Sequence, residues 1–141
     1  MIEIINRQRS RRVNAKHWRD FSERAIRVIG SSKQAATIVL VSDAAIRKLN
    51  RQFRGKGQAT DVLSFPNQAE PFENENRSQL GEVVISVERA AAQAKENGLT
   101  FSNEVEQLIL HGLLHLCGYD HETDNGEMNR LELKLRKKLG I

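Results

Sequence analysis

Three histidines in the last third of the chain have the spacing of a catalytic metal site. They lie in the stretch HGLLHLCGYDH, as His111, His115 and His121, with Gly118 before the last of them. The helical zinc proteases have this spacing in the pattern H-E-x-x-H-x-x-G-x-x-H, but Gly112 stands here in place of the glutamate. The stretch therefore predicts the ligands of a hydrolytic metal site without the general base of a protease.

Helix geometry explains how the three side chains can share one ion. Residues four apart lie on one face, so His111 and His115 can point to the same metal. His121 lies too far along a straight helix, because ten residues rise about 15 Å. Gly118 is the expected left-handed residue that ends the helix and turns the chain, so that His121 approaches from a loop.

The three imidazoles would leave a fourth tetrahedral position for water, which is typical of catalytic zinc sites. We expect one Zn²⁺ ion, although imidazole also suits nickel, copper and iron. Cys117 points away from His115 in a continued helix, so we interpret it as a small buried apolar residue. Asp120 and Glu122 either orient a ligand histidine or are solvated turn residues. The remaining histidine, His17, is interpreted as an ordinary polar side chain.

The glycine at position 112 disfavours a protease. In helical zinc proteases the glutamate activates water and contributes roughly 10²–10⁴-fold to the rate. Cleavage of a phosphodiester depends instead on cations that stabilise charge on the phosphate oxygens. Residues 47–56 carry five basic side chains and no acid, and Arg54 among them offers a bidentate guanidinium. The same run is also compatible with a solvated basic face.

The elements that must position these residues are predicted from hydrophobic periodicity, β-branched runs and helix caps. Strands are expected at 1–5, 36–41, 62–64 and 82–86. Helices are expected at 17–29, at 43–50, from a cap at Ser86 to Gly98, from about Ser102 through the first two histidines, and at 125–138. Residues 51–61 are expected to form a loop, and 67–79 a polar connection. This order predicts an α/β or α+β fold with a mixed sheet of about four strands and about five surrounding helices.

Length and composition fit one globular domain over residues 1–141. The chain is 39% hydrophobic and 28% charged, with a net charge of +4 that is compatible with a polyanionic partner. Its single cysteine excludes an internal disulfide, and its charged N-terminus is unlike a signal peptide. The longest apolar run, 35–41, is too short to cross a bilayer. A cytoplasmic protein without a membrane segment is expected.

Three blocks of the sequence resemble the YbeY-type rRNA maturation endoribonucleases. They are NRQFRGKGQATDVLSFP at 50–66, LGEVVIS at 80–86 and HGLLHLCGYDH at 111–121, in the order that the family has. The blocks span residues 50–121, and together they are far more specific than the histidine spacing alone. One departure is Gly57-Gln58, where relatives often carry an acid after the lysine, which affects only the electrostatics of that loop.

The resemblance implies a zinc-dependent, single-strand-specific endoribonuclease that acts in 16S rRNA 3′-end maturation and ribosome quality control. It implies a mixed sheet with helices around it, the metal at the mouth of a cleft, and Thr60, Asp61 and Ser64 near the cleft floor. The family's metal ligands fall on the three histidines of the 111–121 block, and its functional arginine falls on Arg54. The implied partners are single-stranded RNA, rRNA and the 30S subunit, together with ribosomal proteins or an assembly GTPase.

We therefore expect catalysis to depend on His111 and Arg54, with the arginine binding the scissile phosphate beside the metal. Either water or the RNA's own 2′-hydroxyl can be the nucleophile, and no residue is singled out as the general base. The alternative is a non-catalytic, metal-containing ribosome-assembly or RNA-binding factor, since phosphate contacts alone give sequence-independent binding.

Overall fold

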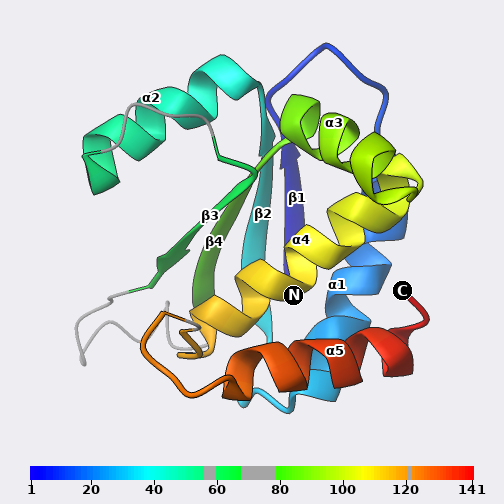
Figure 1. Ribbon diagram of the computed structural model, residues 1–141, viewed down its shortest axis with the longest axis vertical. Coiled ribbons are helices and arrows are strands. Elements are labelled where there is room, and N and C mark those ends of the chain that lie inside the picture. Colours follow the sequence, from blue (N-terminus) through cyan, green and yellow to red (C-terminus); the bar gives the residue numbers. More distant parts are fainter. Residues whose placement is uncertain (56–59, 68–78, 121) are drawn as a thin grey trace.

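The computed structural model describes residues 1–55, 60–67, 79–120 and 122–141, and of Arg54 it describes the backbone alone. Within these ranges strands and helices alternate and then give way to helices, as the sequence predicts (Figure 1). In chain order the elements are β1 (Ile2–Asn6), α1 (Ala15–Ile29), β2 (Ala35–Val41), α2 (Asp43–Arg54), β3 (Val62–Pro66), β4 (Gln79–Ser86), α3 (Val87–Asn97), α4 (Phe101–Leu116) and α5 (Glu127–Leu139).

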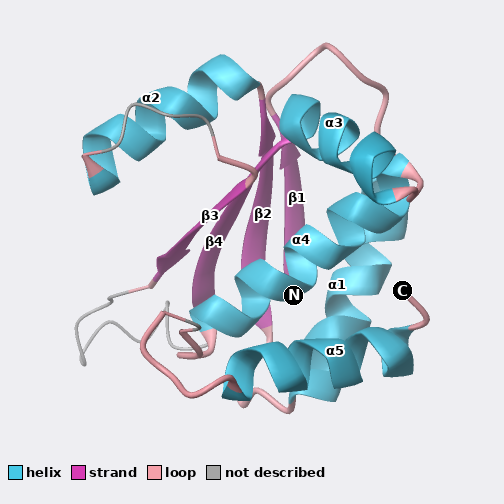
Figure 2. Cartoon of the chain, in the orientation of Figure 1, coloured by secondary structure: helices cyan, strands magenta, loops and turns pink. Residues whose placement is uncertain are grey.

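The described strands form one mixed sheet, which confirms the predicted fold class. Their order is β1-β2-β4-β3, with β1, β2 and β4 parallel and β3 antiparallel to β4 (Figure 2). β3 is therefore an edge strand, and the proline at its end, Pro66, is tolerated because an edge position does not need every backbone N–H.

Helices cover the two faces of the sheet unequally. Alternate residues of a strand point to opposite faces, so Ile38 and Leu40 of β2 join a large apolar cluster with α1, α4 and α5. Their neighbours Val39 and Val41 join a much smaller cluster under α2. In Figure 1, α2 stands apart from the other helices, which gather on the other side of the sheet. We call these the α4 face and the α2 face.

The predicted caps are found where helices begin. Ser42 Oγ accepts a hydrogen bond from Ala45 N at the start of α2, and Ser86 Oγ accepts one from Arg89 N at the start of α3. These bonds satisfy backbone donors that have no partner within the helix. The prediction for the helix after Ser102 was one residue late, because Thr100 is the cap of α4.

The predicted end of α2 was wrong. Residues 51–54 were assigned to a loop, but α2 continues to Arg54 and ends at Gly55, which has a left-handed φ of 68°. The helix continues because Leu49 and Phe53 extend its apolar stripe by one turn, and the Phe53 ring packs edge-on against Phe65, with centroids 5.3 Å apart. The rest of the predicted loop at 56–59, and most of the predicted acidic connection at 68–78, lie outside the described residues.

The expectation about membranes can be compared with the helices. Within the parts of the chain that the structure describes, no helix has the length and apolar character needed to cross a bilayer.

Candidate functional site

Helix α4 holds the first two histidines of the motif on a rigid support. Its buried side carries apolar residues with no exposed surface, among them Ile109, Leu110, Leu113 and Leu114, which fix it against the sheet and its neighbouring helices. His111 and His115 lie on a side of α4 that is only partly exposed. The helix ends at Leu116, and Gly118 has the left-handed φ of 98° that the sequence predicts.

The two histidines meet at their Nε2 atoms. These atoms are 3.2 Å apart, and the ring planes cross at 76°. Two imidazole nitrogens bound to one zinc ion at about 2.0–2.1 Å in tetrahedral geometry stand roughly 3.3 Å apart. The spacing of the pair therefore fits two ligands of a single ion.

The third predicted ligand, His121, lies outside the described residues. Among the residues that are described, no group of three His, Cys, Asp or Glu side chains could hold a metal ion. A three-histidine site with one zinc ion therefore stays a prediction, which the geometry of the His111 and His115 pair fits.

Glu132 of α5 fixes the orientation of His111. The distance between His111 Nδ1 and Glu132 Oε1 is 2.6 Å, and the largely buried carboxylate also accepts a 2.6 Å hydrogen bond from Arg136 Nη2. With the proton on Nδ1, His111 donates to the carboxylate and keeps the Nε2 lone pair directed toward His115, as a metal ligand requires. Glu132 thus holds His111 in the orientation that coordination of a metal would need.

Glu132 remains a carboxylate despite its burial. Burial raises the pKa of Glu132, but the hydrogen bond and charge of His111 and the interactions with Arg136 outweigh it, so that the pKa lies below its usual value. The ionised form is the stronger acceptor for the histidine N–H.

The sequence analysis did not find Glu132, and offered Asp120 or Glu122 for its role. Asp120 Oδ1 instead accepts a hydrogen bond from Glu122 N, 2.9 Å away, which closes the turn after α4. A signal was present in the sequence, because Glu132 occupies the buried stripe of α5 between Met128 and Leu135. An ionisable residue in an apolar stripe needs a buried partner.

A cavity of about 590 Å³ opens on the side of the histidine pair that faces β3. Thr60, Asp61 and Ser64 line it together with His111 and His115, as the resemblance to the endoribonucleases implied. Ser64 Oγ donates to the carbonyl oxygen of Gly112, 3.3 Å away, and so ties β3 to the middle of α4. We call this hollow the histidine cavity, and Gly118, Tyr119, Asp120 and Glu122 also line it.

The position of Gly112 explains why the glutamate of the zinc proteases is missing. A Cβ atom there would lie 2.5 Å from Val83 Cγ1 and 3.3 Å from Ser64 Oγ. Position 112 faces the sheet, and any side chain there would have to displace Val83. Glycine fits without such a displacement.

The other candidate residues lie on α2 and α1. Arg54 is the last residue of α2, and its side chain is outside what the structure describes. The exposed side of the same helix carries Arg47, Lys48 and Arg51. His17 lies on α1, and its Nε2 atom is 3.5 Å from Glu106 Oε1. It is not among the residues that line the histidine cavity.

Cys117 follows α4 and packs against the large apolar cluster, but it is only partly buried and not buried as predicted. Burial raises the pKa of the Cys117 thiol, which a hydrogen bond with Ser31 lowers only in part. A thiol in this state is a poor metal ligand.

The chain is similar to proteins of one family. The family model described as "Endoribonuclease YbeY" matches residues 3–140. A protein named Endoribonuclease YbeY from Nautilia profundicola is 50% identical over 104 residues, which are 74% of this chain and 71% of that protein. Another of the same name, from Geobacter metallireducens, is 36% identical over 141 residues, with 99% of this chain and 94% of that protein covered.

A solved structure has the same fold. The solution structure of TM1509 from Thermotoga maritima superimposes with a TM-score of 0.64 at 30% sequence identity, and the match covers 99% of this chain and 89% of that one. The similarity therefore extends over the whole mixed sheet and its helices, beyond the three sequence blocks.

Proposed function

The chain belongs to the endoribonuclease YbeY family, and from this membership we propose that it cleaves single-stranded RNA with the help of one zinc ion held by His111, His115 and His121. It is an endoribonuclease, a hydrolase of RNA phosphodiester bonds, in rRNA processing. The proposal adds the metal, the single-stranded substrate and the roles of individual residues.

The single observation that carries the metal proposal is the histidine pair. The Nε2 atoms of His111 and His115 stand 3.2 Å apart, and the Nδ1 atom of His111 is engaged by Glu132. Such an arrangement leaves ligand nitrogens facing one point from a rigid helix, which is what a transition metal requires. Bound there, zinc would supply a Lewis acid for a phosphoryl oxygen and lower the pKa of water.

Other residues of the chain orient His111, accept a proton and bind the RNA. Glu132 holds the proton on Nδ1 of His111 and keeps this ring oriented. Asp61 and Glu122 line the same cavity, and their carboxylates are candidates for the group that accepts the proton of the nucleophile. The exposed cations of α2 attract the RNA backbone, and Arg54 at the end of this helix binds the scissile phosphate.

The biological setting forms part of the same proposal. The substrate is the 3′ end of 16S rRNA in the cytoplasm, and ribosome quality control uses the same cleavage. Partners are the 30S subunit and ribosomal proteins or an assembly GTPase. What supports this setting is family membership together with the exposed basic residues of α2.

Cleavage of a labelled single-stranded RNA by zinc-loaded protein tests the proposal. His115→Ala and Arg54→Ala should each lose cleavage by at least about a hundredfold, since each removes a group that acts on the phosphate. His17→Ala is the matched control, because this histidine is half exposed and far from the cavity, and it should cleave as the unaltered protein does. Casein should remain intact throughout.

Equal cleavage by all of these proteins would refute the proposal. RNA binding without any cleavage would instead favour the non-catalytic assembly factor, which the same basic helix could serve.

A further inference from the structure

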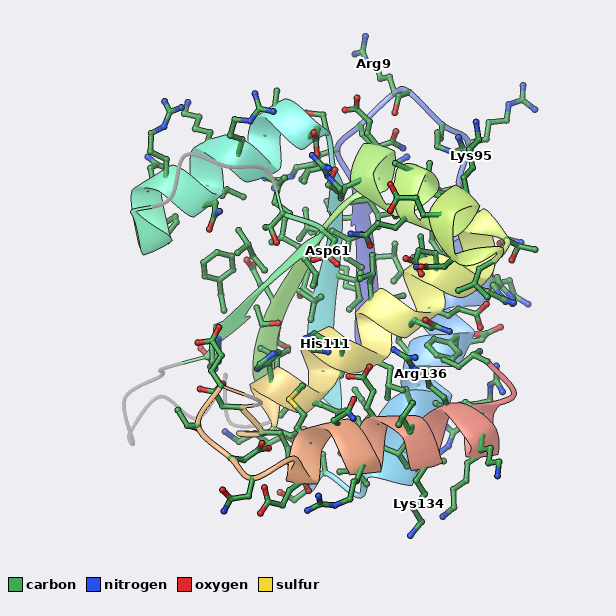
Figure 3. All side chains as sticks on the ribbon, viewed as in Figure 1. Arg9, Asp61, Lys95, His111, Lys134 and Arg136 are labelled. Atoms are coloured by element: carbon green, nitrogen blue, oxygen red, sulfur yellow. The ribbon has the colours of Figure 1, made fainter. Side chains whose placement is uncertain are left out.

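A second cavity of about 560 Å³ lies on the other side of His111. Residues of α3, α4 and α5 line it, and Asp61 at the start of β3 contributes to both cavities. Asp61, His111 and Arg136, which Figure 3 labels, come from three different segments and all line this hollow. His111 thus lines both cavities, and the proposed function uses only the first of them.

The polar groups of this second cavity are held in place by one another. Glu104 is 4% exposed, and its Oε1 accepts a hydrogen bond from Asn97 Nδ2, 3.2 Å away. With its amide nitrogen turned toward them, Gln93 lies 3.2 Å from both Asp61 Oδ2 and Glu104 Oε1. The two carboxylates are therefore fixed as acceptors by amide donors.

Gln107 offers a further amide. It also lines the cavity, and its side chain makes no hydrogen bond to any residue that the structure describes. A partly buried amide one turn before His111 in α4 thus has both a donor and an acceptor to offer to a ligand.

The lining of the second cavity disfavours two classes of ligand, anions and metal ions. A phosphate or other anion would meet the carboxylates of Asp61, Glu104 and Glu132, while Arg136, the one cation among the described residues of the lining, is already paired with Glu132. A metal ion would need three ligand groups within reach of one point, and the described residues do not bring three together. A neutral ligand that is rich in hydrogen-bond donors fits this wall.

A nucleobase with an exocyclic amino group has this chemistry. Carboxylates accept from the amino group of cytosine, and amides pair with adenine, whereas uracil presents carbonyl oxygens in the same places. Leu99 and Leu108 give the cavity an apolar side for the face of a ring. Proteins that recognise single-stranded RNA commonly take an unstacked base out and hydrogen-bond its edge in this manner.

We infer that this second cavity binds one base of the RNA, next to the phosphate that is cleaved, and that it favours cytosine or adenine over uracil. The inference rests on the proposed function, because it takes RNA as the ligand and His111 as the marker of the cleavage point. Since one ring separates the two cavities, a base in the second places a neighbouring phosphate at the first.

Equilibrium binding to the full chain tests this inference without depending on cleavage. The probes are two fluorescent 2′-O-methyl heptamers that resist hydrolysis, one with seven uridines and one with a central cytidine. The cytidine probe should bind about tenfold more tightly. Gln107→Ala and, separately, Glu104→Gln should reduce this preference to less than about threefold. Asn129→Ala, an exposed amide on α5 outside both cavities, should retain it.

Equal binding of the two probes to the unaltered protein would overturn the inference. So would a preference that persists in Gln107→Ala and Glu104→Gln, once circular dichroism shows that both variants are folded. A cytidine preference in a protein that fails to cleave RNA would refute the proposed cleavage and leave the base site standing. Cleavage without any base preference would refute the base site and leave the proposed cleavage standing.

Discussion

The two faces of the sheet differ in packing and in chemistry. On the α4 face a large apolar cluster surrounds the helix that bears the histidine pair, and its members include Phe21, Ile109 and Leu113, all without exposed surface. On the α2 face the core has five buried side chains among the residues that the structure describes, and Phe53 at the end of α2 is 65% exposed. The cations that would attract RNA lie on this less densely packed side.

This difference shows which face suits metal binding and which suits contacts with the RNA backbone. Metal ligands must be held to within a fraction of an ångström, so they need a helix that is fixed on several sides. Contacts to a phosphate backbone tolerate movement, because they act through charge over a longer range. Strong packing on the α4 face and weaker packing on the α2 face suit these two demands.

The largest effect is expected where α4 approaches the sheet most closely. Gly112→Glu would restore the sequence pattern of a zinc protease, but its Cβ would collide with Val83. We expect a loss of about 3 kcal/mol or more in the free energy of unfolding, and no cleavage of casein. Chemical denaturation measures this loss. Gly30→Ala, where a Cβ meets no atom within 4 Å, should cost only about 1 kcal/mol for its left-handed backbone.

A stable Gly112→Glu protein with protease activity would show that α4 is not held as tightly as the comparison requires.

The same substitution on each face compares the two cores directly. Ile109 and Ile46 are both fully buried, the first in the large cluster and the second in the small one. Ile109→Ala should lose about 4 kcal/mol of unfolding free energy and Ile46→Ala about 2 kcal/mol, because the surroundings of Ile46 can close over the cavity more easily. Urea denaturation of both variants gives the two values side by side. The opposite ranking would contradict the division into a rigid and a looser face.

A smaller effect is expected from the carboxylate that orients His111. Glu132→Gln keeps the size of the side chain but weakens its hydrogen bond with Nδ1 of His111 and its ion pair with Arg136. Zinc affinity, measured by competition with a chromophoric chelator, should fall by about 10–100-fold. Glu96→Gln, an exposed acid on α3, should leave the affinity unchanged. Unchanged affinity in Glu132→Gln would mean that α4 alone positions the histidine.

Much of the fold could be predicted because it follows from local patterns. The caps at Ser42 and Ser86, the β-branched run of β2 and the turn at Gly118 each depend on a few neighbouring residues. The mixed sheet followed from the order of the elements. The end of α2 could not be placed, because its last turn depends on Phe53 meeting Phe65 of another element.

The candidate site shows the same limit. The spacing of His111 and His115 sufficed to predict a pair that could share an ion, because four residues span one helical turn. Glu132 lies 21 positions further on, and only the packing of α5 against α4 brings it to His111. The missing glutamate was visible in the sequence, but its cause, the contact of Gly112 with Val83, is likewise a tertiary one.

The most direct test of the central claim is to titrate zinc into metal-free protein while following the cleavage of a labelled single-stranded RNA. Cleavage should be absent at the start, rise in proportion to bound zinc and level off at one ion per chain, and His115→Ala should show no such rise. Full cleavage by the metal-free protein, or a rise of equal size in His115→Ala, would contradict the claim that the histidine pair holds the catalytic metal.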